Sequence, residues 1–220
     1  MNDATGTTNF VHGIPYVAIS IGFTVSREPT IGVVLNPFTA HLYTAIRHQG
    51  SHLTLLSPPL TSTLSTTPLP LYPPQPLSLH TSVIAIEYGS TRSGPNFDVK
   101  LSTFKNLASE SGGMAHGFRA YGSAALNLCG VASGFLDAYW EGGCWEWDVC
   151  AGWVILKEAG GCIVDGNPRE GEEDGERAME SPDLCGRVHL AVRMARGEEE
   201  TESWVREFWS LMGGRLDYGR

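Results

Sequence analysis

A strictly alternating run near the start of the chain, residues 16–25, constrains the fold most strongly. Its large apolar residues are Val17, Ile19, Ile21, Phe23 and Val25, and the small residues between them are Ala18, Ser20, Gly22 and Thr24. A period of two residues predicts a β-strand, because successive side chains of a strand point to opposite faces. The small residues predict that another element packs closely against the second face.

Two more strands complete an antiparallel meander. Arg27-Glu28-Pro29 predicts a turn, residues 30–35 a second strand, Asn36-Pro37 another turn, and residues 41–46 a third strand.

A proline-rich segment follows, because residues 51–80 hold seven of the thirteen prolines and no charged side chain. Proline lacks a backbone N–H and imposes extended geometry. We expect a surface insertion between two core strands, without a helix or central strand. It either has no role of its own or serves as a docking segment.

The second half of the chain alternates helix and strand. Strands are predicted at residues 82–86, 135–139, 162–164 and 188–192, and helices at residues 97–108, 123–134, 149–159 and 198–212. On the first of these helices, the apolar side is expected to consist of Phe97, Leu101, Phe104, Leu107 and Ala108. A meander followed by this alternation predicts a mixed α/β (α+β) fold with two sheets, divided into halves at 1–110 and 111–220.

Charge and cysteine content exclude several classes of function. The net charge is −9 and no basic stripe occurs, which argues against nucleic-acid binding. No apolar run is long enough for a membrane span. The five cysteines are odd in number and form no C-x-x-C motif, which indicates free thiols in a reducing compartment such as the cytoplasm. Residues 165–183 are strongly acidic and predict a solvated loop.

Two short motifs could carry chemistry. The first is Gly6-Thr7-Thr8-Asn9-Phe10, whose backbone N–H groups and hydroxyls could hold a phosphate if a helix begins there. The second is Trp147-Asp148 at the start of a predicted helix. A carboxylate there either caps the helix or helps to hold a metal ion.

Four stretches together resemble the inositol monophosphatase family, the magnesium-dependent, lithium-sensitive phosphomonoesterases. They are residues 6–13 (GTTNFVHG), 19–50, 122–127 (GSAALN), and 147–152 (WDVCAG) followed by 158–161 (EAGG). Glu141 also matches an acidic position of the family. The resemblance covers most of the chain outside 51–80 and the acidic loop. It implies the family's layered αβαβα sandwich, here without the N-terminal helices, in a chain of fungal type.

The resemblance also implies a small phosphorylated substrate such as inositol monophosphate, Mg²⁺ as cofactor, and a homodimer. It assigns Thr7 to orienting the attacking water and Asp148 to holding a metal ion, with the backbone carbonyl of Ala4 as a further ligand. The residues implied in substrate binding are Ala4, Thr5, Gly6, Thr7, Gly122, Ser123, Ala124 and Glu141.

The chain departs from the family at the expected metal site. Asn2 and Thr5 stand where the family has aspartate ligands, and the upstream glutamate motif has no counterpart, which suggests an N-terminally truncated chain. Asp148 is then the one carboxylate that remains of four, unless Asp3 substitutes through a backbone shift. We therefore expect a poor or inactive phosphatase, and apolar surface left uncovered on the meander.

Two other functions stay open from the sequence. The chain could be a non-catalytic relic or binding module on the same scaffold. It could also be a related phosphatase of a quinate- or shikimate-type metabolite or of a nucleotide, although Glu141 and the segment from Gly122 to Ala124 argue against the nucleotide.

Overall fold

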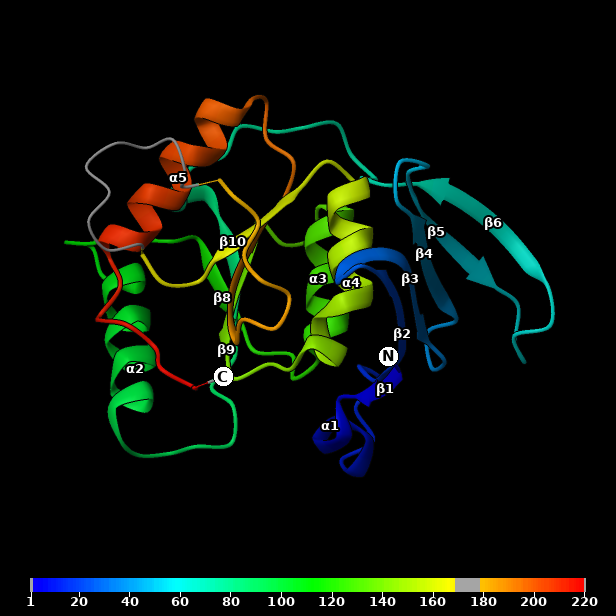
Figure 1. Cartoon of the computed structure of the whole chain (residues 1–220), viewed down its shortest axis with the longest axis horizontal. Coiled ribbons are helices and arrows are strands. Elements are labelled where there is room, and N and C mark those ends of the chain that lie inside the picture. The colour runs from blue at the N-terminus through cyan, green and yellow to red at the C-terminus, as the bar shows by residue number, and fades with distance from the viewer. Residues whose placement is uncertain (1, 169–178, 220) are drawn as a thin grey trace.

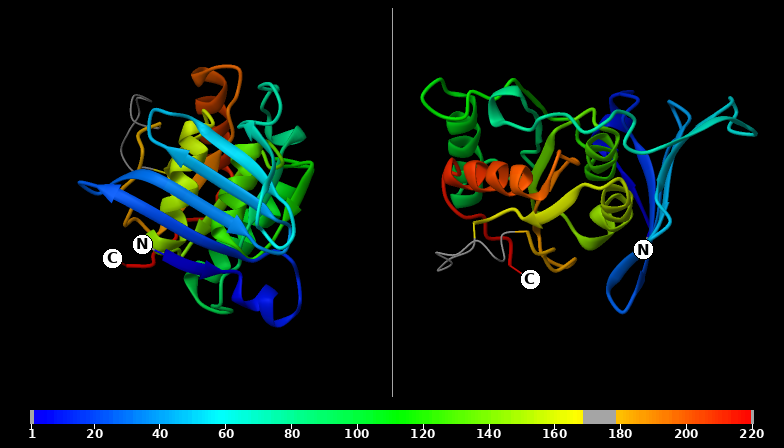
Figure 2. Two further views of the ribbon diagram at one scale, coloured as in Figure 1. Left: turned by 90° about the vertical axis from the view of Figure 1, so that its right-hand side faces the viewer. Right: turned by 90° about the horizontal axis from the view of Figure 1, so that it is seen from above.

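The computed structural model describes residues 2–168 and 179–219 and shows four layers (Figure 1). A six-stranded sheet, a pair of helices, a five-stranded sheet and a second pair of helices follow one another across the molecule (Figures 1 and 2). The predicted mixed α/β fold with two sheets is confirmed. The solvated loop expected within residues 165–183 falls largely outside the described residues.

The six-stranded sheet is antiparallel throughout and runs in chain order. Its strands are β1 (Asn2–Thr5), β2 (Ala18–Val25), β3 (Glu28–Asn36), β4 (His41–Ile46), β5 (Ser51–Leu56) and β6 (Thr63–Pro68), and the short helix α1 (Thr7–Val11) separates the first two. The three strands of the predicted meander are confirmed. The first turn differs, because Ser26 and Arg27 form it with positive φ angles of 51° and 67°, and Pro29 lies within β3.

The small face of β2 packs against helix α4 (Glu146–Glu158), as the alternation predicts. Ala18 and Ser20 are fully or almost fully buried. A Cβ placed on Gly22 would lie 2.5 Å from Sγ of Cys150, and one on Gly32 would lie 2.3 Å from the backbone oxygen of Ala151. The two glycines therefore let the helix approach the sheet more closely than any side chain would permit.

The expectation for residues 51–80 is wrong over its first part. β5 lies between β4 and β6 and is a central strand, and β6 forms the edge of the sheet. The prolines are compatible with this arrangement because none lies in β5, while Pro58 and Pro59 lie in the connecting loop and Pro68 ends the edge strand. Beyond β6 the segment lies without strand pairing and buries Leu69 and Leu77.

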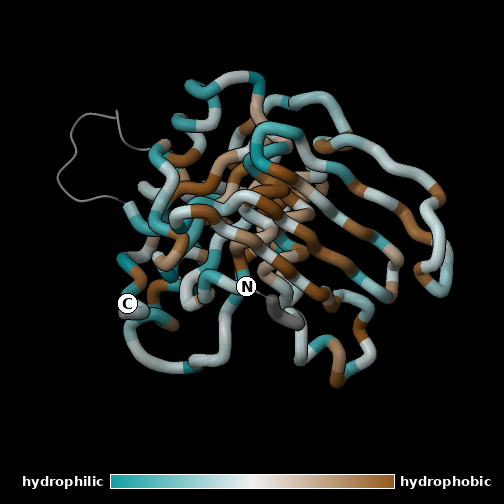
Figure 3. The backbone as a smooth tube through the Cα atoms, turned by 45° about the vertical axis from the view of Figure 1, so that its right-hand side comes forward, coloured by the Kyte–Doolittle hydropathy of each residue, from teal (hydrophilic) through white to brown (hydrophobic). Residues whose placement is uncertain are grey.

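The outer face of the six-stranded sheet is apolar, and none of the elements that the structure describes lies over it (Figure 2). The alternate residues of β2, which are Ile19, Ile21, Phe23 and Val25, are 47% to 56% exposed. Ile31 and Ile46 on neighbouring strands, where Ile31 pairs with both Phe23 and Ile46, are exposed as well, and the hydrophobic colour extends across these strands in Figure 3. The expected uncovered apolar surface is thus present.

Replacing Ile21 and Phe23 with threonine should lower the binding of the dye ANS by about half and reduce concentration-dependent self-association. The free energy of unfolding should change by less than about 1 kcal/mol, because both side chains already face solvent. Phe135→Thr, which removes a similarly exposed aromatic ring outside the sheet, is the control. ANS fluorescence and sedimentation velocity measure the effect, and an equal loss in the control would contradict the assignment.

The five-stranded sheet is mixed, and its order is β10 (Cys162–Asp165), β11 (Val188–Val192), β9 (Ala138–Gly142), β7 (Val83–Ile86) and β8 (Gly117–Arg119). β7 is parallel to both neighbours, and the other pairs are antiparallel. Helices α2 (Pro95–Ala108) and α5 (Glu198–Ser210) cover one face, and η1 (Leu79–Thr81) is a short 3-10 turn. Compared with the prediction, β9 begins and ends three residues later.

The buried face of α2 differs from the predicted one. Leu101 and Ala108 are exposed, whereas Lys100 and Thr103 are fully buried beside Leu107. Both polar side chains have distant partners that helix periodicity does not reveal. Lys100 donates to the backbone oxygen of Gly142, and Thr103 accepts from the backbone N–H of Gly213.

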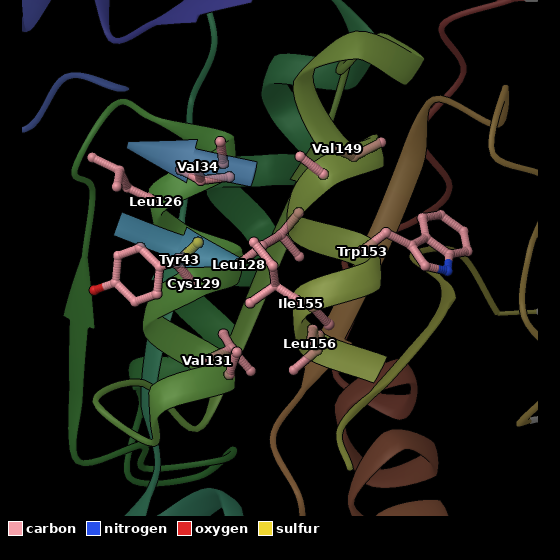
Figure 4. Close-up of a cluster of buried hydrophobic side chains, with 14 of the residues drawn as sticks. Val34, Tyr43, Leu126, Leu128, Cys129, Val131, Val149, Trp153, Ile155 and Leu156 are labelled. Carbon is pink, nitrogen blue, oxygen red and sulfur yellow. The ribbon is translucent and has the colours of Figure 1, made fainter. Parts of the chain in front are cut away.

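Helices α3 (Ala124–Ser133) and α4 form the layer between the sheets, and most of their residues are buried. Figure 4 shows Leu128 and Val131 of α3 close to Ile155 and Leu156 of α4, with Val34 of the first sheet beside them. The N-terminal ends of both helices lie at the same end of the molecule as β1 (Figure 1). None of the described helices is long and apolar enough to cross a membrane.

Candidate active site

The Gly-Thr-Thr-Asn motif lies where β1 passes into α1. Ala4 and Thr5 end the strand, and Ala4 pairs with Ile19 of β2. Gly6 has a φ of +90°, and a Cβ there would lie 2.6 Å from the backbone oxygen of Tyr16, so this turn requires glycine. Thr7 begins α1 and is exposed. A helix does begin at this motif, as its proposed role in phosphate binding requires.

The segment from Gly122 to Ala124 lies directly against this motif. The hydroxyl of Thr5 donates to Oγ of Ser123 over 3.1 Å, and Ser123 caps the start of α3. Nδ2 of Asn9 donates to the backbone oxygen of Tyr121 (2.6 Å) and to that of Tyr16 (2.8 Å). Two stretches more than one hundred residues apart are therefore joined by side-chain hydrogen bonds.

Glu87 is a buried member of this region that the sequence reading missed. One carboxylate oxygen accepts hydrogen bonds from the backbone N–H groups of Tyr121 and Gly122, at 2.8 and 2.7 Å, and from Nδ2 of Asn127 at 2.9 Å. A signal was available, because Glu87 is an acidic residue directly after the apolar strand β7. Asn9 lies inside a recognised motif but received no role of its own.

Glu141 lies on β9 in an environment that favours its neutral form. Burial raises its pKa from the usual 4.5 to about 7; the hydrogen bond from Tyr139 opposes this, and the charge of Glu87 adds to it. The Tyr139 hydroxyl donates to Glu141 and also approaches Sγ of Cys144. Lys100 favours the ionised form without overcoming the effect of burial.

Because the pKa of Glu141 is higher in the folded than in the unfolded chain, the folded state holds more protons between pH 4.5 and 7. The stability contribution is therefore full at low pH and is lost as the pH rises through about 7. Glu141→Gln should raise the free energy of unfolding at pH 8 by about 2 kcal/mol and change it little at pH 4.5. Urea unfolding at both pH values measures this effect, with substitution of the exposed Glu110 (Glu110→Gln) as the control. An equal gain in the free energy of unfolding at both pH values would contradict the prediction.

Asp148 lies in the first turn of α4, where its Oδ2 accepts from the backbone N–H of Trp145 over 2.8 Å. The N-cap residue is Trp145, and Asp148 is the third residue of the helix, which bonds back to the N-cap backbone as in a capping box. Its negative charge and that of Glu141 both raise the pKa of the Cys144 thiol, after burial as the main cause. Trp145 and Trp147 are stacked beside it, and the guanidinium of Arg187 lies 3.7 Å from the Trp145 ring centre.

The donor set does not fit the site for two or three metal ions that the resemblance implies. Among residues 5–168 and 179–219, whose side chains the structure describes, no three His, Cys, Asp or Glu side chains gather closely enough to hold a metal ion. The Thr5 hydroxyl, at one of the replaced ligand positions, already bonds to Ser123. Magnesium prefers several oxygen donors with compensating negative charge. We therefore assign no catalytic step in this chain to a metal ion.

Comparison with known proteins gives one consistent result. A family model described as the inositol monophosphatase family matches residues 5–211. Inositol monophosphatase 2 of Saccharomyces cerevisiae is 44% identical over 216 residues, which are 97% of this chain and 67% of that protein. Protein qutG of Emericella nidulans is 38% identical over 98% of this chain and 67% of its own.

The structural comparison agrees. SaIMPase-II with inositol monophosphate bound superposes with a TM-score of 0.66 and 26% identity, covering 93% of this chain and 68% of that one. The chain belongs to the inositol monophosphatase family.

Proposed function

We propose that this chain binds small phosphorylated polyols, of which inositol monophosphate is the first candidate, and hydrolyses the phosphomonoester slowly. The observation that carries the proposal is the contact between the Gly-Thr-Thr-Asn motif and the segment from Gly122 to Ala124 through the hydrogen bonds of Thr5 and Asn9. The family match and the inositol-monophosphate-bound relative support the same substrate class.

Each end of the substrate has a candidate partner. Gly6 and the exposed Thr7 would receive the phosphate at the start of α1, and Thr7 would orient a water molecule toward it. Ser123, Ala124 and Glu141 would receive the polyol hydroxyls: the serine hydroxyl can donate or accept, the Glu141 carboxylate can accept, and Ala124 can offer only its backbone. Slow turnover follows because these residues do not fit the metal ions whose positive charge would stabilise phosphoryl transfer.

A second candidate substrate is a phosphorylated cyclic polyol of the quinate or shikimate type. The 38% identity to qutG favours it, as does 40% identity to the quinic acid degradation cluster protein x of Neurospora crassa. These substrates also carry ring hydroxyls, so the same segment and Glu141 would serve them.

Two measurements test the proposal. Calorimetric titration with inositol 1-phosphate and with a phosphorylated quinate analogue should show binding by the purified chain, and inositol without phosphate is the control. Phosphate release should be slow and should be followed with and without millimolar Mg²⁺ and Li⁺. Absence of binding to every phosphorylated polyol would contradict the proposal, and binding without any turnover would identify a non-catalytic relic.

We also propose a reducing compartment and a homodimeric assembly for this chain. All five cysteines are free thiols, which supports a reducing compartment such as the cytoplasm. A homodimer follows from the family resemblance, and sedimentation velocity would test it.

A further inference from the structure

The best connected buried carboxylate among the described residues is Glu87, which has no place in the function proposed above. Its side chain is 8% exposed and follows β7 at the end where the substrate segment passes. A single oxygen accepts three hydrogen bonds, all shorter than 3.0 Å, from Tyr121, Gly122 and Asn127. Burying a carboxylate costs free energy, and three donors to one oxygen offset that cost only in one loop conformation.

The loop held in this way is tightly determined. Gly122 has a φ of +78°, and a Cβ there would lie 3.3 Å from Nδ2 of Asn9. Asn9 donates to the carbonyl of Tyr121, while Glu87 accepts from the N–H of Tyr121 and from that of Gly122. The peptide groups on both sides of Tyr121 are therefore fixed by two residues. Asn9 belongs to the connection between β1 and β2 of the six-stranded sheet, and Glu87 follows β7 of the five-stranded sheet.

The third donor links Glu87 to the helix that Ser123 caps. Asn127 lies one turn into α3 and is fully buried, and its Oδ1 is 3.4 Å from the hydroxyl of Tyr16. The Tyr16 ring in turn stacks on that of Tyr121 at 4.7 Å. Glu87 thus fixes both the loop before α3 and the first turn of α3, and these two parts carry Gly122, Ser123 and Ala124.

We propose that Glu87 is a positioning residue for the polyol end of the substrate, which it serves by holding the Tyr121–Gly122 backbone and the start of α3 in the binding conformation. This inference rests on the proposed function. Glu87 touches no substrate in this account; it acts through the segment from Gly122 to Ala124.

The same strand offers a matched control at its opposite end. Asp137 accepts from the backbone N–H of Val83 at the start of β7 over 2.7 Å and pairs with Arg193 at 2.6 Å. Asp137→Ala therefore removes a comparable anchoring carboxylate from β7 without touching the substrate segment. Loss of stability alone should be similar in Asp137→Ala and Glu87→Ala.

Two readouts test the proposal on the full chain. In ¹H–¹⁵N spectra, Glu87→Ala should shift the amide signals of Tyr121 and Gly122 upfield and raise their hydrogen-exchange rates at least about tenfold, whereas Asp137→Ala should leave both unchanged. The dissociation constant for inositol 1-phosphate should rise about tenfold in Glu87→Ala and less than about twofold in Asp137→Ala. Affinity for inorganic phosphate should change less than about twofold in either variant.

Glu87→Gln separates positioning from charge, because its amide oxygen can still accept from the loop. It should restore the affinity for inositol 1-phosphate to within about threefold of the parent chain. Unchanged amide signals in Glu87→Ala, or equal loss of affinity in Asp137→Ala, would overturn the inference. If the parent chain binds no phosphorylated polyol, both the proposed function and the substrate role of Glu87 are wrong. Altered amide signals in Glu87→Ala would in that case show that Glu87 only stabilises the structure of the loop.

Discussion

Gly32→Ala is expected to lower the free energy of unfolding by about 3 kcal/mol or to prevent folding. The added methyl group would lie 2.3 Å from the backbone oxygen of Ala151, and neither the strand nor the helix can rotate away as a side chain could. Gly32 pairs with Gly22 on β2 and with Ala45 on β4, so a shift of β3 would disturb both neighbouring strands. Alanine at this position is otherwise suited to the extended backbone, so the loss would be steric.

Urea unfolding monitored by tryptophan fluorescence measures this effect. Gly197→Ala is the matched control, because a Cβ there meets no atom within 4 Å and its backbone is extended. It should change the unfolding free energy by less than about 1 kcal/mol. Equal stabilities of the two variants would contradict the close packing of α4 against β3 at Gly32.

The second large effect is a gain of function. Introducing Asn2→Asp and Thr5→Asp together should produce Mg²⁺ binding and raise Mg²⁺-dependent phosphate release from inositol 1-phosphate by about a hundredfold or more. The resemblance to the family places its carboxylate ligands at these two positions, and carboxylates supply both the oxygen donors and the negative charge that Mg²⁺ requires. A hundredfold gain corresponds to about 2.7 kcal/mol of barrier, a small part of what such catalysts supply.

Calorimetry with Mg²⁺ alone reads the restored site independently of activity. Adding Asp148→Asn to the double variant should abolish both the binding and the gain. As a control, Thr8→Asp adds one negative charge on the exposed side of α1 and should produce neither Mg²⁺ binding nor a gain in activity. If the double variant folds as the parent does and still binds no Mg²⁺, the two neutral side chains are not what limits this chain.

The sequence predicted most elements because their patterns are local. The period of two in β2, with small residues on one face, predicted both the strand and the close approach of a helix, which Gly22 and Gly32 provide. The high proline content of residues 51–80 wrongly argued against a central strand there. All seven prolines follow β5, so this strand is free to pair on both sides.

The candidate site was predictable only where a motif marks it. Thr5, Gly6 and Ser123 were found by resemblance, and the structure places them together. Glu87 and Lys100 were not found, since their roles depend on partners more than thirty residues away. A buried lysine on an amphipathic helix and a carboxylate after a strand follow no local rule, because only the tertiary fold supplies the groups that stabilise them.

The contact between Gly22 and Cys150 also makes the reactivity of the Cys150 thiol a measure of whether α4 and the six-stranded sheet stay together. The Cys150 thiol is fully shielded between α4 and the six-stranded sheet, and burial raises its pKa, so it is a poor nucleophile while the two layers stay together. A thiol reagent can reach it only when they separate. The rate at which Cys150 is modified in native buffer, compared with that of the partly buried Cys185, would therefore measure how often α4 separates from the six-stranded sheet.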